Sequence, residues 1–424
     1  MHFDSLCVIG MGYIGLPTAS IFASNGIRVI GMDINADITE GLMAGKLHIF
    51  EPGLHGLFME AVDSGRLSIS GEVSPADAFI IAVPTPFYDD KRADMRAVIA
   101  ASESIVPHLR PGNLVILEST SPPRTTVDLV APILEHSGLT AGKDFLLAYS
   151  PERVLPGRIL RELVDNPRVI GGINPASAEA GRDLYRKFVK GDIILTDATT
   201  AEMVKLMENT SRDINIAIAN EFSRLADAFD VDIWEAIEIA NLHPRVDILR
   251  PGVGVGGHCI SVDPWFLVEA APEMAQLIKT AREVNDGQPA FVAEHINTIF
   301  GELQGLRIAF LGLAFKPNVD DLRESPAVEL VHHLMDAGAV VRAYEPFRVN
   351  AGIPGVYQVN SLETVLADAD LIVLGVAHDR FKDLDPNQVR GLTQANRVYD
   401  AVRAWDKASW EAVGFQFYGL ARKY

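Results

Sequence analysis

The chain has 424 residues, which predicts two or three domains, each with a core of its own. Its composition, 48% hydrophobic and 22% charged with no long unbroken apolar run, is typical of globular proteins and excludes a transmembrane role. The 37 Lys and Arg against 56 Asp and Glu give a net charge of -19, which argues against a broad surface for nucleic acid or membranes.

The first twenty residues predict a strand and a turn, because they lack the basic start of a signal peptide and contain three glycines. We therefore expect a cytoplasmic protein. The two cysteines of the chain, Cys7 and Cys259, are too few for a disulfide framework or a cysteine-type zinc site, and no metal is expected.

A dinucleotide-binding pattern opens the chain. An apolar run at residues 6–9 leads into a glycine turn, and a helical stretch at residues 16–24 follows. The turn contains Gly10, Gly12 and Gly15, with Tyr13 and Ile14 between the last two glycines. A second apolar run at residues 28–32 ends at Asp33. The glycines let the backbone turn tightly and approach a pyrophosphate, and the N-terminus of the following helix offers positive potential. A carboxylate at Asp33 suits an adenosine ribose and repels a 2′-phosphate, so the pattern predicts NAD rather than NADP.

Strand and helix patterns continue along the chain. The further predicted strands are residues 78–83, 114–117, 306–312, 340–344 and 371–374, and the further predicted helices are residues 199–240, 272–300 and 325–337. They predict an α/β fold in which two Rossmann-like doubly wound domains are joined by a central helical domain. The predicted domains are residues 1–198, 199–300 and 301–424.

The glycine turn of the second α/β domain is incomplete. It keeps Gly312 but lacks the two later glycines. We do not expect it to hold a pyrophosphate by close backbone approach, and Lys316 offers a positive charge instead.

The two cysteines lie in different surroundings. Cys7 is part of an apolar strand, where a single cysteine is expected to be an inert core residue. Cys259 follows the glycine-rich stretch 254–257, and glycines cost conformational entropy unless a ligand or backbone comes close. His258 and Asp263 are polar neighbours able to tune a thiol. The residue types alone leave open whether Cys259 is a nucleophile or an inert thiol.

Several polar residues have two possible interpretations. Lys205, Asn209 and Arg212 share one face of the predicted central helix, and this stripe either is solvated or lines a cleft. Glu152 follows an apolar run and is either a surface acid or a residue at the strand end where open α/β sheets bind ligands. Arg323 lies in a charge run and is a candidate fork for a phosphate.

Together these stretches resemble the family of UDP-glucose and GDP-mannose dehydrogenases over essentially the whole chain. The motifs that carry the resemblance are residues 10–17, 151–157, 243–246, 256–260, 262–266, 315–316 and 323–325. The middle motifs are most similar to the branch that acts on UDP-N-acetyl-D-mannosamine in bacterial surface-polysaccharide synthesis. The resemblance implies oxidation of a sugar C6 alcohol to a carboxylate, with two hydrides passed to two NAD in sequence.

The resemblance also implies a covalent mechanism. Cys259 would capture the intermediate aldehyde as a thiohemiacetal and hold a thioester after the second hydride transfer. Lys205 would assist proton transfer and stabilise the oxyanion, with Asn209 beside it as a neutral donor. Asp263 would position Lys205 or water, and Glu152 would help to hydrolyse the thioester.

The same resemblance implies two binding sets and a homodimer. The cofactor side comprises Gly10, Gly12, Tyr13, Ile14, Gly15, Asp33, Thr85, Thr120 and Arg323, with Thr120 also in the catalytic set. The substrate side comprises Arg153, Val154, Lys205, Asn209, Arg212, His243, Arg245, Gly252, Gly256, Phe315 and Lys316. Members of the family form dimers through the central helices, and Arg245 would reach into the partner's site.

The chain departs from the family pattern at two places. Ser261 stands where a proline is common, which bears on the rigidity of the cysteine loop. Residues 400–403 fit the C-terminal motif of the family poorly, so the role of Arg403 stays open.

Three rival hypotheses remain. The first is the same oxidation of UDP-N-acetylglucosamine or UDP-glucose, since a few pocket contacts decide the sugar. The second is a two-electron hydroxyacid or sugar-phosphate dehydrogenase, which needs no thiol, so Cys259 argues against it. The third is a non-catalytic nucleotide-sugar sensor. The combined presence of four residues argues against it: Lys205, Asn209, Cys259 and Asp263.

Overall fold

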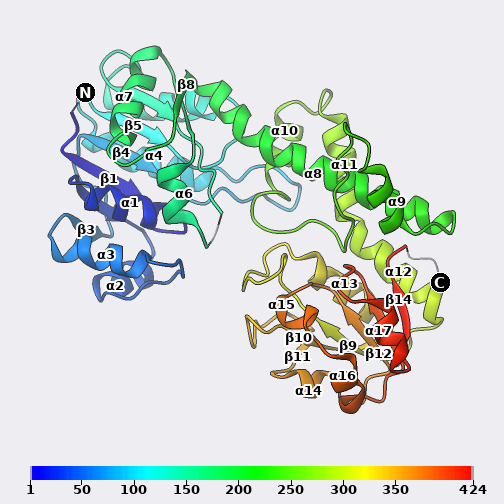
Figure 1. Cartoon of the computed structure of the whole chain (residues 1–424). Helices are drawn as coiled ribbons and strands as arrows, with labels where there is room; N and C mark the ends of the chain where they lie inside the picture. Colours follow the sequence, from blue (N-terminus) through cyan, green and yellow to red (C-terminus); the bar gives the residue numbers. More distant parts are fainter. Residues whose placement is uncertain (1, 156, 422–424) are drawn as a thin grey trace. The chain divides into compact units, whose positions relative to one another are not determined.

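A computed structural model describes residues 2–155 and 157–421 of the chain (Figure 1). The chain folds into two compact units, Met1–Glu208 with Trp265–Pro272 and Asn209–Pro264 with Glu273–Tyr424. Helix α8 (Ala198–Ala228) begins in the first unit and ends in the second. The division into three domains stays a prediction.

The sheet of the first unit has eight strands among the described residues, in the order β3-β2-β1-β4-β5-β6-β7-β8. They are β1 (Ser5–Ile9), β2 (Arg28–Met32), β3 (Leu67–Ser70), β4 (Ala78–Ile81), β5 (Leu114–Leu117), β6 (Leu146–Tyr149), β7 (Arg168–Gly172) and β8 (Ile193–Asp197). All neighbours pair in parallel except β6 and β7, which are antiparallel. The first six follow the 3-2-1-4-5-6 order of dinucleotide-binding sheets, which confirms the fold prediction for this unit.

Helices cover both faces of this sheet (Figure 1). One face packs against α1 (Gly15–Ser24), α2 (Ala36–Met43), α3 (Leu54–Asp63), α6 (Ile159–Asp165) and α7 (Pro175–Tyr185). The other packs against α4 (Arg96–Ile105), α5 (Ala131–Leu134) and the start of α8, and the short helical turns η1 (Val106–His108), η2 (Thr125–Val130) and η3 (Glu135–Ser137) adjoin these. Along β1, Leu6 and Val8 face the first set and Cys7 and Ile9 the second, so Cys7 is a core residue as predicted.

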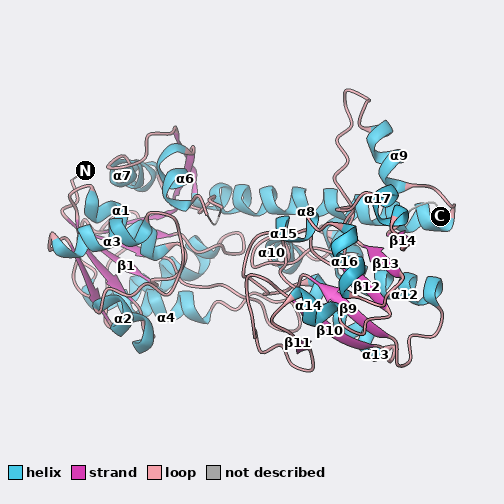
Figure 2. Cartoon of the chain, turned by 60° about the horizontal axis from the view of Figure 1, so that its bottom comes forward, coloured by secondary structure: helices cyan, strands magenta, loops and turns pink. Residues whose placement is uncertain are grey.

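The second unit holds a parallel sheet with six strands among the described residues, in the order β11-β10-β9-β12-β13-β14. They are β9 (Arg307–Leu311), β10 (Val340–Tyr344), β11 (Tyr357–Gln358), β12 (Leu371–Leu374), β13 (Arg397–Asp400) and β14 (Gln416–Gly419). Helices α12 (Gln288–Phe300) and α13 (Pro326–Asp336) pack on one face. On the other lie α14 (Leu362–Leu366), α15 (Asp379–Lys382), α16 (Pro386–Leu392) and α17 (Lys407–Ala412), which completes a second doubly wound sheet (Figure 2).

The two long helices predicted for the middle of the chain are each divided. The first becomes α8 and α9 (Ile233–Ala240), because Asp230 has a φ of 53° and the Asp232 side chain caps the new helix by accepting the Trp234 N–H. The second becomes α11 (Gln276–Asp286) and α12, which starts with Pro289 in its first turn. A shorter helix, α10 (Asp263–Ala270), follows the cysteine loop. Among the described residues, none of the helices has the length and apolar content needed to cross a membrane.

Candidate active site

The glycine turn after β1 has the geometry of a phosphate cradle. Gly10 has a φ of 93°, and a Cβ there would lie 2.5 Å from the Ala82 carbonyl oxygen. A Cβ on Gly15 would meet the Gly10 oxygen at 1.8 Å, so both glycines serve packing within the fold. A Cβ on Gly12 would meet no atom within 4 Å, which leaves its backbone open to a ligand at the start of α1. The residues present therefore fit a dinucleotide.

Asp33 lies beside this turn, directly after the end of β2. Its Oδ2 accepts the Met11 N–H at 2.9 Å, and its Oδ1 accepts the Asn35 N–H at 2.9 Å. His48 lies beside it, and burial lowers the pKa of the imidazole while the Asp33 charge and a Met11 backbone contact oppose the change. The half-buried Asp33 is held at the turn, where each carboxylate oxygen keeps a further acceptor position.

Thr85 and Thr120 lie beyond the carboxyl ends of two neighbouring parallel strands, β4 and β5. Thr85 is buried and Thr120 is half-buried. Ligands of open α/β sheets bind outside these strand ends, so both side chains stand at the expected edge of the sheet.

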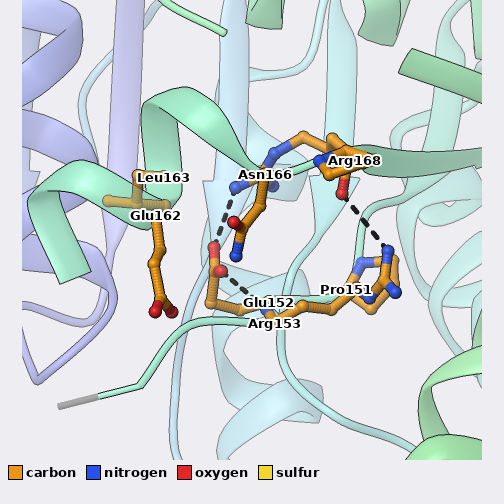
Figure 3. Close-up of a pocket in the computed structure, with 8 residues that line it drawn as sticks. Pro151, Glu152, Arg153, Glu162, Leu163, Asn166 and Arg168 are labelled. Carbon is orange, nitrogen blue, oxygen red and sulfur yellow. Dashed lines mark hydrogen bonds and ion pairs between the residues drawn. The ribbon is translucent and has the colours of Figure 1, made fainter. Parts of the chain in front are cut away.

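Glu152 is tied into a buried charge cluster (Figure 3). Its Oε1 accepts the Arg153 N–H at 2.6 Å and its Oε2 lies 2.8 Å from Nη2 of Arg168. The same Arg168 reaches Glu118 Oε1 at 3.2 Å. The Glu152 side chain is 10% exposed and lies just after β6, so it is not a solvated surface acid. Its role toward a ligand stays a prediction.

The two residues after Glu152 make contacts within the first unit. The Arg153 guanidinium forms an ion pair with Glu208 at 2.5 Å. It also donates to the Pro167 carbonyl at 3.2 Å. The half-buried Val154 packs against the core. Pro156, in the same motif, lies outside the described residues.

The polar stripe of α8 is not simply solvated. Lys205 is 9% exposed and Asn209 is half-buried, whereas Arg212 is exposed. The Asn209 amide donates to Oδ2 of Asp263 at 2.5 Å, and Asp263 is 2% exposed. Asn209 and Asp263, 54 residues apart, are thus brought together as neighbours in the second unit.

Cys259 is exposed one turn before α10. Its carbonyl oxygen accepts the N–H groups of Val262 and Asp263 at 3.0 and 2.9 Å. The Ser261 hydroxyl donates to the Gly257 carbonyl and so links the two ends of the cysteine loop. By contrast, burial raises the pKa of the Cys7 thiol to about 11, so Cys7 is poorly suited to act as a nucleophile.

The glycines before Cys259 admit other parts of the second unit. A Cβ on Gly256 would lie 2.0 Å from the Glu324 carbonyl oxygen, and one on Gly257 would lie 2.7 Å from the Phe315 ring. Protein contacts therefore account for both glycines. Gly252 is fixed at both backbone groups, since its N–H donates to Asn220 at 3.0 Å and its carbonyl accepts from Gln288 at 3.2 Å.

Arg323 and Lys316 lie in the segment that packs on this loop. The Arg323 guanidinium pairs with both oxygens of Asp321, with a shortest distance of 2.6 Å. Burial and the Arg323 charge lower the pKa of His258, while Asp321 opposes the change. The Lys316 ammonium lies 5.4 Å from the centre of the Phe315 ring.

The remaining candidates lie in more open surroundings. His243 and Arg245 are exposed in the loop after α9. Arg403, whose role the sequence left open, pairs with Glu238 at 2.7 Å and lies over the Trp234 ring. Among residues 2–155 and 157–421, no three His, Cys, Asp or Glu side chains are arranged to hold a metal ion.

Sequence reasoning missed three residues of the site. Arg168 and Glu118 contact each other across 50 residues of sequence, and His48 faces Asp33. One signal was present for Arg168, because an arginine opens the otherwise apolar run Val169–Gly172 of a buried strand. Glu118 follows a strand in the same way as Glu152, and nothing in the sequence marks His48.

Sequence models of the UDP-glucose/GDP-mannose dehydrogenase family match three stretches of the chain. The NAD binding domain matches residues 4–189, the central domain residues 199–287 and the UDP binding domain residues 309–407. Together the three matches cover most of both sheets, and β8, α12 and β14 lie outside them.

Full-length relatives are similar throughout. A UDP-N-acetyl-D-mannosamine dehydrogenase of Methanocaldococcus jannaschii is 46% identical, over 98% of this chain and 96% of that protein. An NDP-N-acetyl-D-galactosaminuronic acid dehydrogenase of Ralstonia solanacearum is 47% identical, over 96% of this chain and 97% of that protein. The solved structure of a UDP-D-ManNAc dehydrogenase from Pyrococcus horikoshii has a TM-score of 0.90 at 40% identity and covers 99% of both chains.

Proposed function

The chain belongs to the UDP-glucose/GDP-mannose dehydrogenase family, and on that premise we propose that it oxidises the C6 alcohol of UDP-N-acetyl-D-mannosamine to UDP-N-acetyl-D-mannosaminuronate. It is an NAD-dependent UDP-sugar dehydrogenase. The observation that carries the proposed chemistry is the contrast between the two thiols. Cys259 is exposed on a braced loop beside the buried Asp263, whereas Cys7 is sealed in the core.

The reaction removes four electrons as two hydrides and uses one thiol twice. The alcohol first loses a proton and a hydride to become an aldehyde, and the Cys259 sulfur adds to the aldehyde carbon to give a thiohemiacetal. Loss of the second hydride leaves a thioester, which water cleaves to the carboxylate and the free thiol. NAD, when bound, accepts the hydride in each oxidation.

The catalytic roles are assigned to groups with matching surroundings. Lys205, nearly buried on α8, takes the alcohol proton and stabilises the developing oxyanion, with Asn209 as a neutral donor. Asp263 accepts the Asn209 amide and so fixes the direction of that donor. Glu152 directs the hydrolytic water. Thr120, three residues after the end of β5, is the remaining member of the proposed catalytic set.

The proposed domains are residues 1–198 for NAD binding, residues 199–300 for catalysis and dimerisation, and residues 301–424 for UDP-sugar binding. Residues of the first two domains also contribute substrate contacts. The first holds NAD through Gly10, Gly12, Tyr13, Ile14, Gly15, Asp33, Thr85 and Thr120, joined by Arg323. The UDP-sugar is held by Arg153, Val154, Lys205, Asn209, Arg212, His243, Arg245, Gly252, Gly256, Phe315 and Lys316. Arg153 is paired with Glu208, and Arg323 is paired with Asp321. A bound phosphate would therefore replace a carboxylate as the partner of each arginine.

The number of NADH formed per sugar tests the four-electron reaction. We expect two NADH for each UDP-sugar consumed, measured by absorbance against product quantified by mass spectrometry. One NADH per sugar would indicate a two-electron dehydrogenase, and binding of UDP-sugar without any NADH would indicate a sensor.

The identity of the sugar needs a comparison of substrates. The relatives include proteins named for N-acetylmannosamine and for N-acetylgalactosaminuronic acid at nearly equal identity. We expect the highest kcat/KM with UDP-N-acetylmannosamine among the UDP derivatives of N-acetylmannosamine, N-acetylglucosamine, N-acetylgalactosamine and glucose. A preference for any other sugar would change the substrate and leave the reaction class intact.

We also propose a cytoplasmic homodimer that supplies uronate for surface polysaccharide. Large apolar side chains are exposed along α8 and α9, including Phe222, Leu225 and Ile239, which suits pairing with a second copy. Arg245, exposed beyond α9, would then complete the partner's site. Mixing the inactive variants Cys259→Ala and Arg245→Ala should restore part of the activity in mixed dimers, whereas no recovery would exclude a role in trans.

A further inference from the structure

One buried guanidinium in the first unit, that of Arg168, contacts two carboxylates. Arg168 is 5% exposed, and its Nη2 lies 2.8 Å from Oε2 of Glu152. Its Nη1 lies 3.2 Å from Oε1 of Glu118 and 2.9 Å from the Ser150 hydroxyl. Figure 3 shows the Glu152 carboxylate between the Arg168 side chain and the backbone of Arg153. Of this group only Glu152 has a role in the proposed function.

The fold brings these groups together through the one antiparallel pair of the sheet. Glu118 and Ser150 follow the carboxyl ends of β5 and β6. Arg168 is the first residue of β7, and because β7 runs antiparallel to β6, its start lies at the same edge of the sheet. An arginine at the start of a parallel strand would lie at the opposite edge. The direction of β7 therefore places Arg168 on the ligand-binding side.

Tyr185 contacts both Arg168 and its partner Glu118. The Tyr185 ring lies 4.2 Å from the guanidinium carbon, and the Tyr185 hydroxyl donates to Glu118. Tyr185 in turn packs edge-on or tilted against Phe188 and Phe22 in the core. The guanidinium is thus held by a stack, a hydroxyl and two carboxylates, with little freedom to turn.

The charges favour Glu152 as the partner of Arg168. Burial raises the pKa of Glu118 to about 7, the Glu152 charge adds to that rise, and Arg168 opposes it. Glu118 is therefore protonated in a large share of the molecules up to about pH 7, and in those molecules the Arg168 charge is left to balance Glu152. Both oxygens of Glu152 are then fixed, one by Nη2 of Arg168 and one by the Arg153 N–H, and each keeps a lone pair for a water.

We propose that Arg168 is a positioning residue that holds the Glu152 carboxylate in the orientation needed for thioester hydrolysis. This rests on the hydrolytic role of Glu152 in the proposed function. In that step the water oxygen adds to the thioester carbon and its proton passes to Glu152. The carbon–sulfur bond then breaks, Cys259 leaves as a thiolate and takes up that proton, and the product acid releases its own proton to solvent. Nothing is oxidised or reduced, so Arg168 acts after both hydride transfers.

The test separates hydride transfer from hydrolysis in full-length Arg168→Lys, with Arg161→Lys as the matched control. Arg161 is a solvent-exposed arginine on α6, 83% exposed and 3.4 Å from Asp165. We expect Arg168→Lys to form two NADH per site in the first turnover at nearly the wild-type rate. Uronate release should then be roughly 10- to 100-fold slower, because lysine cannot hold the carboxylate with a planar fork. Acid-quenched protein should carry the acyl group on Cys259, detected by intact mass.

An added nucleophile distinguishes positioning from general damage. Hydroxylamine cleaves thioesters without help from Glu152, so it should restore steady-state NADH formation in Arg168→Lys and leave Arg161→Lys unchanged. Equal slowing of hydride transfer and hydrolysis, or no rescue, would overturn the inference. Should Arg168→Lys not fold, Tyr185→Phe removes the hydroxyl that donates to Glu118, the second carboxylate beside Arg168, and should show the same split with a smaller slowing.

Glu152→Gln tells the two levels of the proposal apart. Acyl-enzyme in Glu152→Gln but not in Arg168→Lys would overturn the role of Arg168 alone. Acyl-enzyme in neither variant would overturn the hydrolytic role of Glu152 and with it this inference. A single NADH per site in the wild-type protein would overturn the four-electron function itself, whatever the variants do.

Discussion

Each of the two doubly wound sheets carries an acid directly after its second strand, but the two acids affect the neighbouring glycine turn differently. The sheets share the strand order 3-2-1-4-5-6, counted within each, and Asp33 and Glu345 follow the equivalent strands β2 and β10. Each acid accepts the N–H of the residue after the first turn glycine, Met11 in one sheet and Leu313 in the other. They differ in what else they touch.

Glu345 fills the place that Asp33 leaves open. It is 1% exposed, and its Oε2 accepts the N–H groups of Leu313 and Ala314 at 2.8 and 3.0 Å. The same oxygen lies 3.0 Å from Nε2 of the buried His378. Ala314 corresponds to Gly12, whose surroundings are open to a ligand. One extra methylene thus lets the protein's own carboxylate occupy the turn, so topology alone does not make a dinucleotide site.

The largest expected effect comes from removing the buried acid. Glu345→Ala leaves two backbone donors and His378 without their acceptor, which should lower the unfolding free energy of the second unit by about 3–5 kcal/mol. Asp33→Ala, at a half-buried site, should cost about 1 kcal/mol or less. Urea unfolding followed by tryptophan fluorescence measures both. Equal losses would mean that the two acids are structurally equivalent.

The next effect concerns cofactor binding at the open turn. Gly12→Val adds a Cβ that, apart from the neighbouring residues of the chain, has no protein atom within 4 Å, so the melting temperature should stay near that of the wild type. The side chain would nevertheless occupy the place of the pyrophosphate and weaken NAD binding roughly 100-fold, about 3 kcal/mol. Isothermal titration with NAD measures the change.

The second turn provides the control for that experiment. Ala314→Gly restores the missing glycine of the second sheet but leaves Glu345 in place. It should neither create a second NAD site nor alter the first. Two NAD bound per chain would contradict the view that Glu345 closes the turn.

This comparison also shows what the sequence was able to predict. The first glycine turn, Asp33 and the strand at Leu371–Leu374 were all readable, because local patterns of apolar residues and glycines define them. The break between α8 and α9 was missed, since it depends on the left-handed Asp230 and the cap at Asp232 rather than on glycine or proline. Local sequence patterns thus predict that a helix or strand exists more reliably than they predict where it ends.

Contacts between distant residues set the limit for the site. Asn209 and Asp263 were assigned by resemblance, but that the amide of one faces the carboxylate of the other depends on the tertiary fold. Arg168 reaches Glu152 because β7 is antiparallel, a direction that no local pattern encodes. The sequence likewise shows an acid after β10 without showing that it turns inward.

The pH dependence of stability should differ in sign for one buried glutamate in each unit. Burial raises the pKa of Glu118 from 4.5 to about 7, so its contribution to stability is full below pH 4.5 and is lost as the pH rises through 7. For Glu345, burial acts against ionisation, but His378 and backbone N–H groups outweigh it and lower the pKa. Its contribution is present above pH 4.5 and is lost as the pH falls through the lowered pKa.

Two substitutions separate these contributions. In the wild-type protein, ionisation of Glu118 should lower the unfolding free energy by about 2 kcal/mol between pH 5 and 8. This decrease should be absent in Glu118→Gln, whereas the pH dependence below pH 5 should stay unchanged. Glu345→Gln should flatten the acid side below pH 5 and leave the neutral range unchanged. Urea unfolding across pH 3–9 measures both profiles, and matching slopes in the two variants would contradict the assignment.

The smallest effect is expected at the thiol of the first unit. Cys7→Ala removes one buried sulfur from β1, which should cost about 1 kcal/mol in unfolding free energy and leave NADH formation near the wild-type rate. With a pKa of about 11 and no exposure, Cys7 should resist iodoacetamide at pH 7, whereas the exposed Cys259 should be alkylated and the enzyme inactivated. Peptide mapping after brief labelling locates the adduct. Labelling of Cys7 at a rate comparable to that of Cys259 would show that the first sheet opens on that timescale. Inactivation by Cys7→Ala would contradict the assignment of Cys7 to the core and Cys259 to catalysis.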